Sequence, residues 1–275
     1  MQKVLTDIHT HSSFSHDGIS SADEMFCAAK EKGVKYFGVS EHFDYKDGKK
    51  LTWTNPQYFA YDRAIKEKYE KGGKMVILVG AEFSQMQSEE FFDVDSATKN
   101  EPYFNAVKEL IKEYKPDFVV NSVHSRAFIE NNPKDKAYRR YLTEVLQSLE
   151  VPFEYDIVAH LGYCERYAPY EDRKFYYAEY KELFDEIFKK IIEKGKILEV
   201  NGKSRKEDDG RSFCPNEELL TAYYNAGGRE ISYASDAHDT KSILQNRETI
   251  VAVLKRIGFE YLTVPVCGEH QKIEI

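Results

Sequence analysis

The sequence predicts an α/β fold in which parallel strands alternate with helices in one domain spanning residues 1–275. Short apolar runs, many of them rich in β-branched residues, alternate seven times with longer segments of helical period. The length of 275 residues suits a barrel of such units, which commonly takes about 250 residues. No Pro-, Gly- or Ser-rich linker divides the chain, and it has no internal repeat.

The strands are expected at the short apolar runs, and a further apolar run lies near the end of the chain. The seven expected strands are Val4–Ile8, Tyr36–Ser40, Met75–Ala81, Phe118–Val123, Ile157–Ala159, Ile197–Val200 and Ile231–Ala234, and the last run is Tyr261–Val266.

The segments between these runs carry helix start and stop signals. Ser21 to Glu24 form a capping-box pattern, and Gly33 is placed to end the helix that follows. The less regular stretch Ser84–Asn100 is expected to be a long loop. The other expected helices are Gln57–Lys71, Tyr103–Tyr114, Asp135–Leu149, Lys174–Lys194, Asn216–Asn225 and Lys241–Ile257.

Composition excludes several classes of protein. With 39 Lys and Arg against 47 Asp and Glu, the net charge of −8 argues against a broad nucleic-acid surface. The longest run without a charged residue, Leu51–Tyr61, is well short of the roughly 20 apolar residues of a membrane span. The first residues lack the apolar core of a signal peptide. The four cysteines contain no Cys-x-x-Cys pair, so we expect a reduced, cytoplasmic protein without a thiolate zinc site.

Polar side chains follow the predicted strands, and six of the eight histidines lie just past a strand end. In a closed parallel barrel, the carboxyl ends of all strands meet at one mouth, where the active site is built. One histidine at a strand end is usually structural, but imidazoles gathered with carboxylates suit divalent metals. The sequence therefore predicts a metal site at the mouth. The residues in question are His9, His11, His42, Glu82, His124, His160, Asp236 and His238, together with Asp17.

Five of these segments form an ordered set of motifs. They are His9-Thr10-His11 with Asp17 six residues later, Glu41-His42, Gly80-Ala81-Glu82, Ser122-Val123-His124 and Asp236-Ala237-His238. In this order they resemble the motifs of the polymerase-and-histidinol-phosphatase (PHP) superfamily of metal phosphoesterases. The resemblance implies the PHP fold, a distorted (β/α)7 TIM-like barrel.

Within that superfamily the chain is most similar to the histidinol-phosphatase branch, through Ala159–Gly162, Arg166–Tyr170 and Leu198–Asn201. The branch often has Gly and Asp where this chain has Ala159 and Gly162, and Lys203 stands where an Arg is common. These departures leave the metal-binding motifs intact.

The resemblance implies up to three divalent ions, for which Zn, Fe and Mn are all suitable. The first would be held by His9, His11, Glu82 and Asp236, the second by Glu82, His124 and His160, and the third by Asp17, His42 and His238. A hydroxide bridging the first two ions would be the nucleophile. The residues expected to be catalytic are Glu82, Asp236 and His238.

Cations near the mouth are candidates for binding the phosphate group. Arg166 is the first choice because a guanidinium matches phosphate bidentately. Lys203 and Arg205 are weaker candidates, because they begin a run of charges that would equally suit a solvated surface. Glu41 and Asp44 are candidates for contacting a cationic substrate, and Trp53, Tyr58 and Phe59 for walling a pocket. His16 and His270 are expected to be outside the metal site.

The expected activity is hydrolysis of a small phosphorylated substrate, first of all L-histidinol phosphate to L-histidinol and phosphate. Three alternatives stay open. The first is a PHP-type phosphoesterase acting on another phosphorylated small molecule or a nucleotide. The second is an amidohydrolase-type barrel, which would have a metal-bridging lysine where His124 stands. The third is a non-catalytic metal-binding barrel, which would need closed coordination shells. No nucleic-acid or membrane partner is expected, and the sequence does not predict an oligomeric state.

Overall fold

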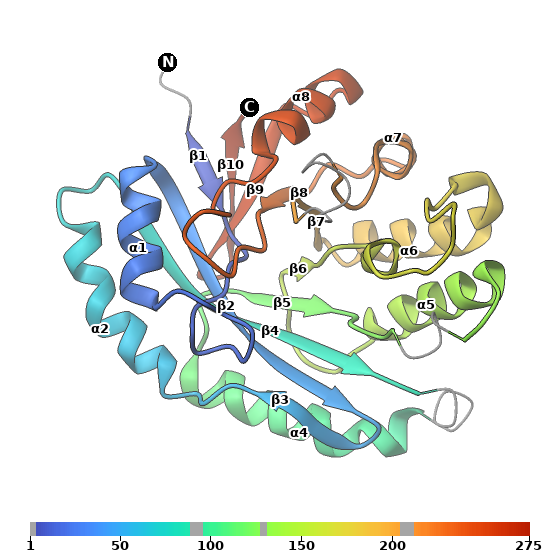
Figure 1. Ribbon diagram of the computed structural model, residues 1–275, viewed down its shortest axis with the longest axis horizontal. Coiled ribbons are helices and arrows are strands. Elements are labelled where there is room, and N and C mark those ends of the chain that lie inside the picture. Colours follow the sequence, from blue (N-terminus) through green and yellow to red (C-terminus); the bar gives the residue numbers. More distant parts are fainter. Residues whose placement is uncertain (1–3, 89–95, 127–130, 204–211) are drawn as a thin grey trace.

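A computed structural model describes residues 4–88, 96–126, 131–203 and 212–275, with side chains from residue 100 onward in the second range (Figure 1). Seven parallel strands form one sheet in the order β1-β2-β4-β5-β6-β7-β8. They are β1 (Leu5–Asp7), β2 (Val34–Lys46), β4 (Val76–Met86), β5 (Val119–Ser122), β6 (Ile157–Val158), β7 (Ile197–Asn201) and β8 (Ile231–Ala234).

The two outer strands of this sheet meet and nearly close a barrel. Just beyond β1 and β8, Thr10 and Ala237 form a parallel bridge. The backbone N–H of His11 donates to the carbonyl of Ala237 at 2.8 Å, and that of Asp236 donates to the carbonyl of His9 at 2.9 Å. The predicted α/β barrel of seven strands is confirmed, and its closure joins the first and last of the predicted metal-binding motifs.

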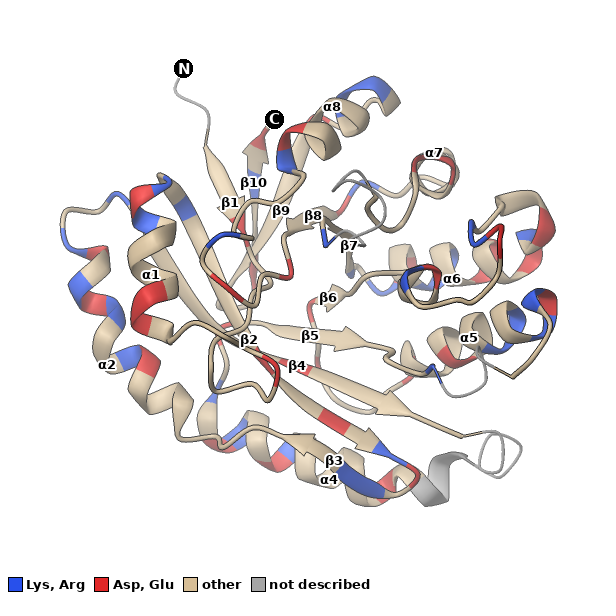
Figure 2. Ribbon diagram, viewed as in Figure 1, with Lys and Arg blue, Asp and Glu red and all other residues tan. Residues whose placement is uncertain are grey.

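Helices surround the strands, and their outer faces carry many of the charged residues (Figures 1 and 2). Ser21 caps the first helix in both directions, since its Oγ accepts from the Glu24 N–H at 3.3 Å while Glu24 Oε2 accepts from the Ser21 N–H at 2.7 Å. The helices are α1 (Ala22–Glu31), α2 (Tyr58–Glu70), α4 (Ser96–Tyr114), α5 (Lys134–Ser148), α6 (Lys181–Glu193), α7 (Glu217–Asn225) and α8 (Arg247–Ile257).

The second strand is longer than predicted and turns back on itself. It continues to Lys46 and pairs antiparallel with β3 (Lys49–Trp53), which the sequence did not predict. Asp47 and Gly48 form the turn with φ of 48° and 80°. An Asp-Gly pair is a typical two-residue hairpin signal, so this hairpin had a local signature.

The expected loop Ser84–Asn100 is wrong at both ends. Strand β4 continues to Met86, which pairs with Lys46 of the extended β2. Helix α4 begins at Ser96 and includes Pro102, although proline normally occupies the first turn of a helix. The stretch is therefore strand at its beginning and helix at its end, and residues 89–95 of it lie outside the described part of the chain.

Two other helices begin later than predicted. Helix α6 starts at Lys181, after a short 3-10 turn at Tyr177–Glu179, and not at Lys174. Helix α8 starts at Arg247, because Asn246 before it has a left-handed backbone with φ of 59° and interrupts the helical period.

The last apolar run forms a strand that closes the far end of the barrel. Strand β9 (Tyr261–Val266) pairs antiparallel with β10 (Glu269–Glu274), which was not predicted. Val264 and Ile273 of this hairpin pack in one cluster with Leu78, Phe118 and Ile197 from the barrel interior. None of the helices in the described ranges combines the length and apolar composition needed to cross a lipid bilayer.

Candidate metal centre

Along the barrel strands, the inward-facing side chains change from apolar at one end of the barrel to polar at its mouth. Side chains two residues apart point to the same face of a strand. On β4 the inward positions are Leu78, Gly80 and Glu82, and Leu78 lies in the apolar interior cluster. Gly80 is needed because a Cβ there would lie 2.5 Å from the Phe118 ring. Glu82 is the next inward residue and is completely buried at the mouth.

The Glu82 carboxylate is the centre around which the histidines gather. Its Oε1 lies 3.1 Å from His160 Nε2 and 3.2 Å from His124 Nε2. Its Oε2 lies 2.7 Å from His42 Nδ1 and 3.4 Å from His9 Nε2. The 2.7 Å contact lacks hydrogen-bond geometry, and neither of its two atoms has another hydrogen-bond partner within the described residues. Both oxygens of Glu82 therefore face imidazole nitrogens, and Oε2 does so without a hydrogen bond within the described residues.

Three overlapping groups of side chains have ligand atoms within 4.8 Å of one another among the described residues. The groups are His9, His11 and Asp236; His42, Glu82 and His124; and His11, His42 and His238. Asp17 joins the last of these, since its Oδ1 lies 3.5 Å from His42 Nε2 and its Oδ2 3.1 Å from His238 Nε2. The structure thus brings together all nine residues that the sequence singled out, although His42 also borders the group around Glu82.

The facing nitrogens of this cluster fit divalent metal ions. His9 Nε2 and His11 Nε2 lie 3.0 Å apart, and His124 Nε2 and His160 Nε2 lie 3.3 Å apart. Two neutral imidazoles that point their lone pairs at each other repel, and a cation between them removes the conflict. Neutral imidazoles and carboxylates are ligands that first-row divalent ions prefer. The centre is therefore suited to divalent metals.

Electrostatics keeps the carboxylates of the centre ionised. Burial works to raise the pKa of Glu82, but His124, His9 and His42 outweigh it and hold that pKa well below its usual value. The same holds for Asp236, whose pKa is lowered by Lys203 and His11 against the effect of burial. These carboxylates are thus available as anionic ligands.

The imidazoles differ in the direction in which their surroundings shift their pKa values. Burial lowers the pKa of His124, yet Glu82 and Asp44 raise it to about 9. The pKa of His11 is held well below its usual value by burial and by the neighbouring His42 and His238. Without metal, the cluster therefore takes up protons next to its carboxylates, and metal binding would displace them.

Two residues of the centre have a strained backbone. His160 and Asp236 have φ of 29° and 53°, in the left-handed region that non-glycine residues seldom occupy. Both are predicted ligands that follow a strand directly. Backbone conformations of this kind persist where surrounding contacts enforce them, and they are common at functional sites.

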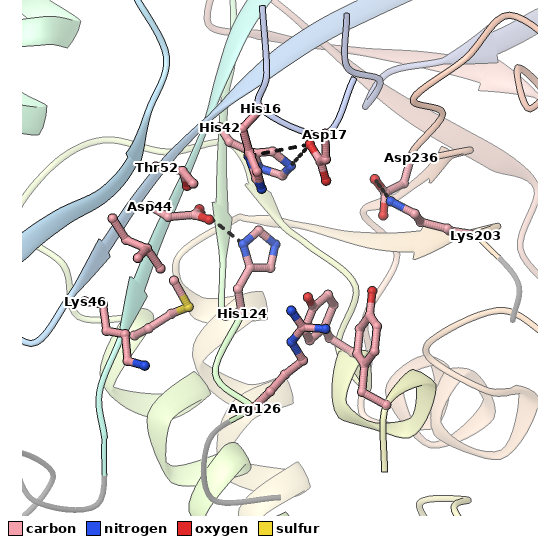
Figure 3. Close-up of a pocket in the computed structure, with 14 residues that line it drawn as sticks. His16, Asp17, His42, Asp44, Lys46, Thr52, His124, Arg126, Lys203 and Asp236 are labelled. Carbon is pink, nitrogen blue, oxygen red and sulfur yellow. Dashed lines mark hydrogen bonds and ion pairs between the residues drawn. The ribbon is translucent and has the colours of Figure 1, made fainter. Parts of the chain in front are cut away.

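A cavity of about 480 Å³ opens over the centre (Figure 3). Lys203 faces it, with Nζ 3.2 Å from Asp236 Oδ1 and 3.2 Å from His238 Nδ1. Asp44 lies on its other side, with Oδ1 3.2 Å from His124 Nδ1. The lining residues are His16, Asp17, His42, Asp44, Lys46, Leu51, Thr52, Met86, His124, Arg126, Tyr163, Tyr167, Lys203 and Asp236.

The predicted phosphate-binding residues fall in different places. Arg166 is almost completely buried and donates from Nη1 to Asp236 Oδ2 at 3.1 Å and from Nη2 to Asn201 Oδ1. It lines a smaller neighbouring cavity of about 170 Å³, to which Lys203 also belongs. Lys203 is therefore the candidate cation that borders both cavities. Arg205 lies outside the described residues.

Several other candidates lie apart from the metal centre. Glu41 is buried and accepts from the hydroxyls of Ser12 and Ser15, so it supports the first loop and does not line the cavity. Tyr58 and Phe59 pack in the core, and Trp53 does not line the cavity either. The His16 side chain is 55% exposed at the rim. His270 lies on the C-terminal hairpin, 3.6 Å from Glu230, as expected for a residue outside the site.

The segment Leu198–Asn201 is part of the family resemblance, but its residues Glu199 and Asn201 have no role among the predicted site residues. Both are completely buried beneath the metal centre, and Glu199 Oε2 lies 2.7 Å from His9 Nδ1. Their signal was positional, because Glu199 and Asn201 share the inward face of β7 with Ile197 of the apolar interior cluster.

Comparison with known proteins agrees with this arrangement. The model of the PHP domain family matches residues 7–203. A probable histidinol-phosphatase of Thermotoga maritima is 26% identical over 260 residues, which are 94% of this chain and 95% of the relative. The histidinol-phosphatase of Lactococcus lactis subsp. lactis is 27% identical over 266 residues, which are 93% of this chain and 92% of the relative.

A solved structure matches almost the entire chain. It is the crystal structure of histidinol phosphate phosphatase from Lactococcus lactis subsp. lactis in complex with zinc, L-histidinol and phosphate. The TM-score is 0.77 at 25% identity, and the match covers 98% of this chain and 99% of that one.

Proposed function

The chain belongs to the PHP domain family, and we propose that it is a metal-dependent phosphomonoesterase that hydrolyses L-histidinol phosphate to L-histidinol and phosphate. Relatives that match nearly the full length include a probable histidinol-phosphatase and a histidinol-phosphatase, and a histidinol phosphate phosphatase is solved with zinc, L-histidinol and phosphate. In this chain, the geometry of the mouth supports the same chemistry.

One observation carries the proposal. Eight imidazole and carboxylate side chains converge with Glu82 at the floor of a cavity of about 480 Å³, with the ammonium group of Lys203 beside them. A phosphomonoester requires ligands for metal ions, a cation for the phosphoryl oxygens and room for a leaving group. Histidines and carboxylates shared among several ions leave coordination positions open, which favours catalysis over a purely structural metal site.

The nine side chains would hold three divalent ions, with Zn, Fe and Mn all compatible with the donor set. His9, His11, Glu82 and Asp236 form one proposed set, Glu82, His124 and His160 a second, and Asp17, His42 and His238 a third. When bound, such ions lower the pKa of water and polarise phosphate oxygens.

The chain's own residues would position the metal ions and neutralise the charge of the phosphate group. Glu82 is proposed to bridge two sites, because its two oxygens face different histidines. Lys203 and Arg166 both contact Asp236 and would place positive charge on one side of the phosphate. Arg205 belongs to the same proposal. Tyr163 and Tyr167, in the cavity wall, would exclude water from the leaving group.

The histidine at position 124 bears on a rival activity. An amidohydrolase-type C–N hydrolase would have a bridging lysine there, whereas here His124 Nε2 faces Glu82 at 3.2 Å. The bridging carboxylate comes from β4 instead. This arrangement supports phosphoester hydrolysis.

We also infer a cytoplasmic, reducing setting, because all four cysteines are free thiols. Nucleic acid is not a proposed partner, in keeping with the net charge of −8.

The test is phosphate release from L-histidinol phosphate by protein whose metal content has been measured. We expect kcat/KM above about 10⁴ M⁻¹s⁻¹, and values far lower for p-nitrophenyl phosphate and a nucleoside monophosphate. Lys203→Gln should lower kcat/KM about 10- to 100-fold, since one cation on the phosphate is lost. As a control, Lys35→Gln changes a lysine that donates to the Gly73 carbonyl away from the cavity, and it should leave kcat/KM unchanged. Equally slow turnover of all three substrates would contradict the histidinol phosphate assignment.

A further inference from the structure

We propose that strand β7 supplies two positioning residues that set the two halves of the site separately. Glu199 orients His9 for metal binding, and Asn201 holds Arg166 and Lys203 for phosphate binding. Neither residue is a ligand in the sets described above. Both lie on the inward face of one strand, beneath the mouth, and both are completely buried.

Glu199 is a buried carboxylate with three donors around it. Its Oε2 lies 2.7 Å from His9 Nδ1. Its Oε1 accepts from the backbone N–H of His160 at 3.2 Å and from Asn201 Nδ2 at 2.7 Å. Burial of a carboxylate is costly unless such donors surround it, so these contacts define its orientation. Glu199 thereby ties the ends of β1 and β6 to β7.

The contact with His9 decides which ring nitrogen is free. A carboxylate accepts hydrogen bonds and cannot donate one when ionised, so Nδ1 of His9 must carry the proton. Nε2 is then left with its lone pair, and it points toward His11 Nε2 at 3.0 Å and Glu82 Oε2 at 3.4 Å. Partners of this kind fix the tautomer and ring orientation of metal-binding histidines.

The contact with His160 supports a strained backbone. His160 has φ of 29°, and its N–H is held by Glu199 while its Nε2 faces Glu82 at 3.1 Å. A conformation of this kind persists where surrounding contacts enforce it. Glu199 therefore acts on two predicted ligands from different strands.

Asn201 continues the network toward the phosphate side. Its Oδ1 accepts from Arg166 Nη2 and from the backbone N–H of Lys203 at 3.0 Å. Its Nδ2 donates to Glu199 Oε1 at 2.7 Å and approaches Asp236 Oδ2 at 3.3 Å. Asn201 thus holds the guanidinium of Arg166 and the backbone from which the Lys203 side chain extends, and these come from different parts of the chain. This half of the inference rests on the proposed function, whereas the Glu199 half rests on the metal centre alone.

Glu199→Gln is the sharpest test of the first half, because it preserves shape and changes one acceptor into a donor. If the new amide group faces His9, the ring must present its Nδ1 lone pair and protonate Nε2. If it faces the other way, it meets the donors of His160 and Asn201. Either arrangement disfavours metal binding, so we expect zinc affinity of the metal-free protein to fall about 10- to 100-fold in a titration against a chelator.

A matched control lies on the neighbouring strand. Ser232 pairs with Glu199 in the β7–β8 register, is equally buried, and its Oγ has no hydrogen-bond partner within the described residues. Ser232→Ala should leave zinc affinity within twofold of the parent. Zinc affinity of Glu199→Gln within twofold of the parent would overturn the role of Glu199, and so would an equal loss in Ser232→Ala.

A second measurement needs no substitution and covers the case in which Glu199→Gln does not fold. Long-range ¹H–¹⁵N spectra of the zinc-loaded parent protein report the tautomer of each histidine. We expect a His9 ring protonated at Nδ1. A His9 protonated at Nε2, or one that exchanges between the two forms, would contradict the inference.

Asn201→Ala tests the second half with inorganic phosphate as the probe. In the metal-loaded protein we expect the dissociation constant of phosphate to rise about tenfold, as the Arg166 guanidinium and the Lys203 backbone lose their shared acceptor. Zinc affinity should stay within twofold of the parent, and KM should rise more than kcat falls. An unchanged phosphate affinity, or a loss of zinc as large as in Glu199→Gln, would overturn the separate role of Asn201.

The outcomes separate this inference from the proposed function. If phosphate fails to bind the parent protein, the proposed function is wrong and the Asn201 half fails with it. The Glu199 half is still decided by zinc titration and by the His9 tautomer. If phosphate binds but L-histidinol phosphate is not turned over, only the substrate assignment fails.

Discussion

The two ends of the barrel are built from the same seven strands but are filled in opposite ways. At the end closed by the β9–β10 hairpin, the interior is apolar, with Ile8, Leu78 and Phe118 among its buried side chains. At the mouth, the inward residues are histidines, carboxylates and amides, nearly all of them buried. Two or four residues along a strand separate one environment from the other, as from Leu78 to Glu82.

The difference shows where the fold gains stability and where it gives some of it up. The apolar end satisfies its side chains by close packing. At the mouth, His42 Nδ1, Glu82 Oε2 and His160 Nδ1 are buried without hydrogen-bond partners in the described part of the chain. His160 and Asp236 also have left-handed backbone. Such unsatisfied and strained groups are expected at a functional site, where a ligand compensates for them.

Removing the Glu82 carboxylate should abolish metal binding and catalysis at the mouth without preventing the barrel from folding. In Glu82→Ala we expect kcat/KM to fall by about 10³-fold or more, because the proposed bridging ligand is lost. Metal content should fall with it. The metal-free variant should still fold but unfold at a lower temperature than the metal-free parent, because the imidazoles around position 82 lose their counter-charge. Phosphatase assays, metal analysis and thermal unfolding of the metal-free forms measure the three effects. Full activity in this variant would exclude the metal mechanism.

Truncating Phe118 should destabilise the apolar end of the barrel and leave the metal centre unchanged. Its ring lies against the backbone of Gly38 and Gly80 in the barrel interior. Phe118→Ala is expected to lower the free energy of unfolding by about 3 to 5 kcal/mol, because a buried aromatic side chain leaves a cavity. Urea unfolding of the metal-free protein measures this loss.

Zinc affinity of the folded Phe118→Ala protein should match that of the parent. Tyr261→Ala provides a control, since this side chain is 44% exposed and should contribute less than about 0.5 kcal/mol. A large loss of zinc affinity in Phe118→Ala would show that the two ends are coupled and would weaken the comparison.

A buried carboxyl group outside the metal centre can be compared with the carboxylates of the mouth, and the expected effect on stability is smaller. Asp62 on α2 is completely buried, and neither of its oxygens has a hydrogen-bond partner within the described residues. Burial and the nearby Glu41 raise its pKa from 3.8 to about 8. The mouth carboxylates Glu82 and Asp236, which face cations, have their pKa values lowered instead.

The sign of the resulting pH dependence follows from linkage. Between pH 3.8 and pH 8, the unfolded chain loses the Asp62 proton while the folded chain keeps it, so stability falls as pH rises through this window. Asp62→Asn removes that loss. We expect its gain in Tm over the parent to grow from pH 5 to pH 8, by about 2 to 4 °C for each kcal/mol. Calorimetry at both pH values measures it, and a gain larger at pH 5 would refute the assignment.

Much of the barrel could be predicted because its signals are local. Buried parallel strands appear as short apolar runs, and the Ser21 capping box and the glycine or proline a few residues after each helix mark helix ends. The missed β2–β3 hairpin had a local signal in Asp47-Gly48, but another error arose where long-range contacts decide. Strand β4 continues to Met86 only because the extended β2 offers it a partner. Helix α4 tolerates Pro102 within the folded protein.

The candidate metal ligands were predictable for a related reason. All of them except Asp17 stand just beyond the carboxyl end of an expected strand, and closing a parallel barrel brings these ends to one mouth. Burial and pairing were not predictable in the same way. Glu41, next to His42, accepts hydrogen bonds from the hydroxyls of Ser12 and Ser15. Asp44, in contrast, contacts His124 and lines the cavity. Adjacent positions on a strand face opposite ways, and which neighbour they meet depends on the partner strand.

The sequence by itself determined the order of strands and helices, the metal-binding residue types and the end of the barrel where they gather. Periodicity and the single direction of parallel strands are enough for these. Only the tertiary structure decided that Glu82 stands at the centre, that Arg166 is engaged by Asp236 and Asn201, and that Glu199 lies behind His9. Those relations join residues up to 190 positions apart, as between His9 and Glu199, and side-chain distances at that separation exist only once the barrel has closed.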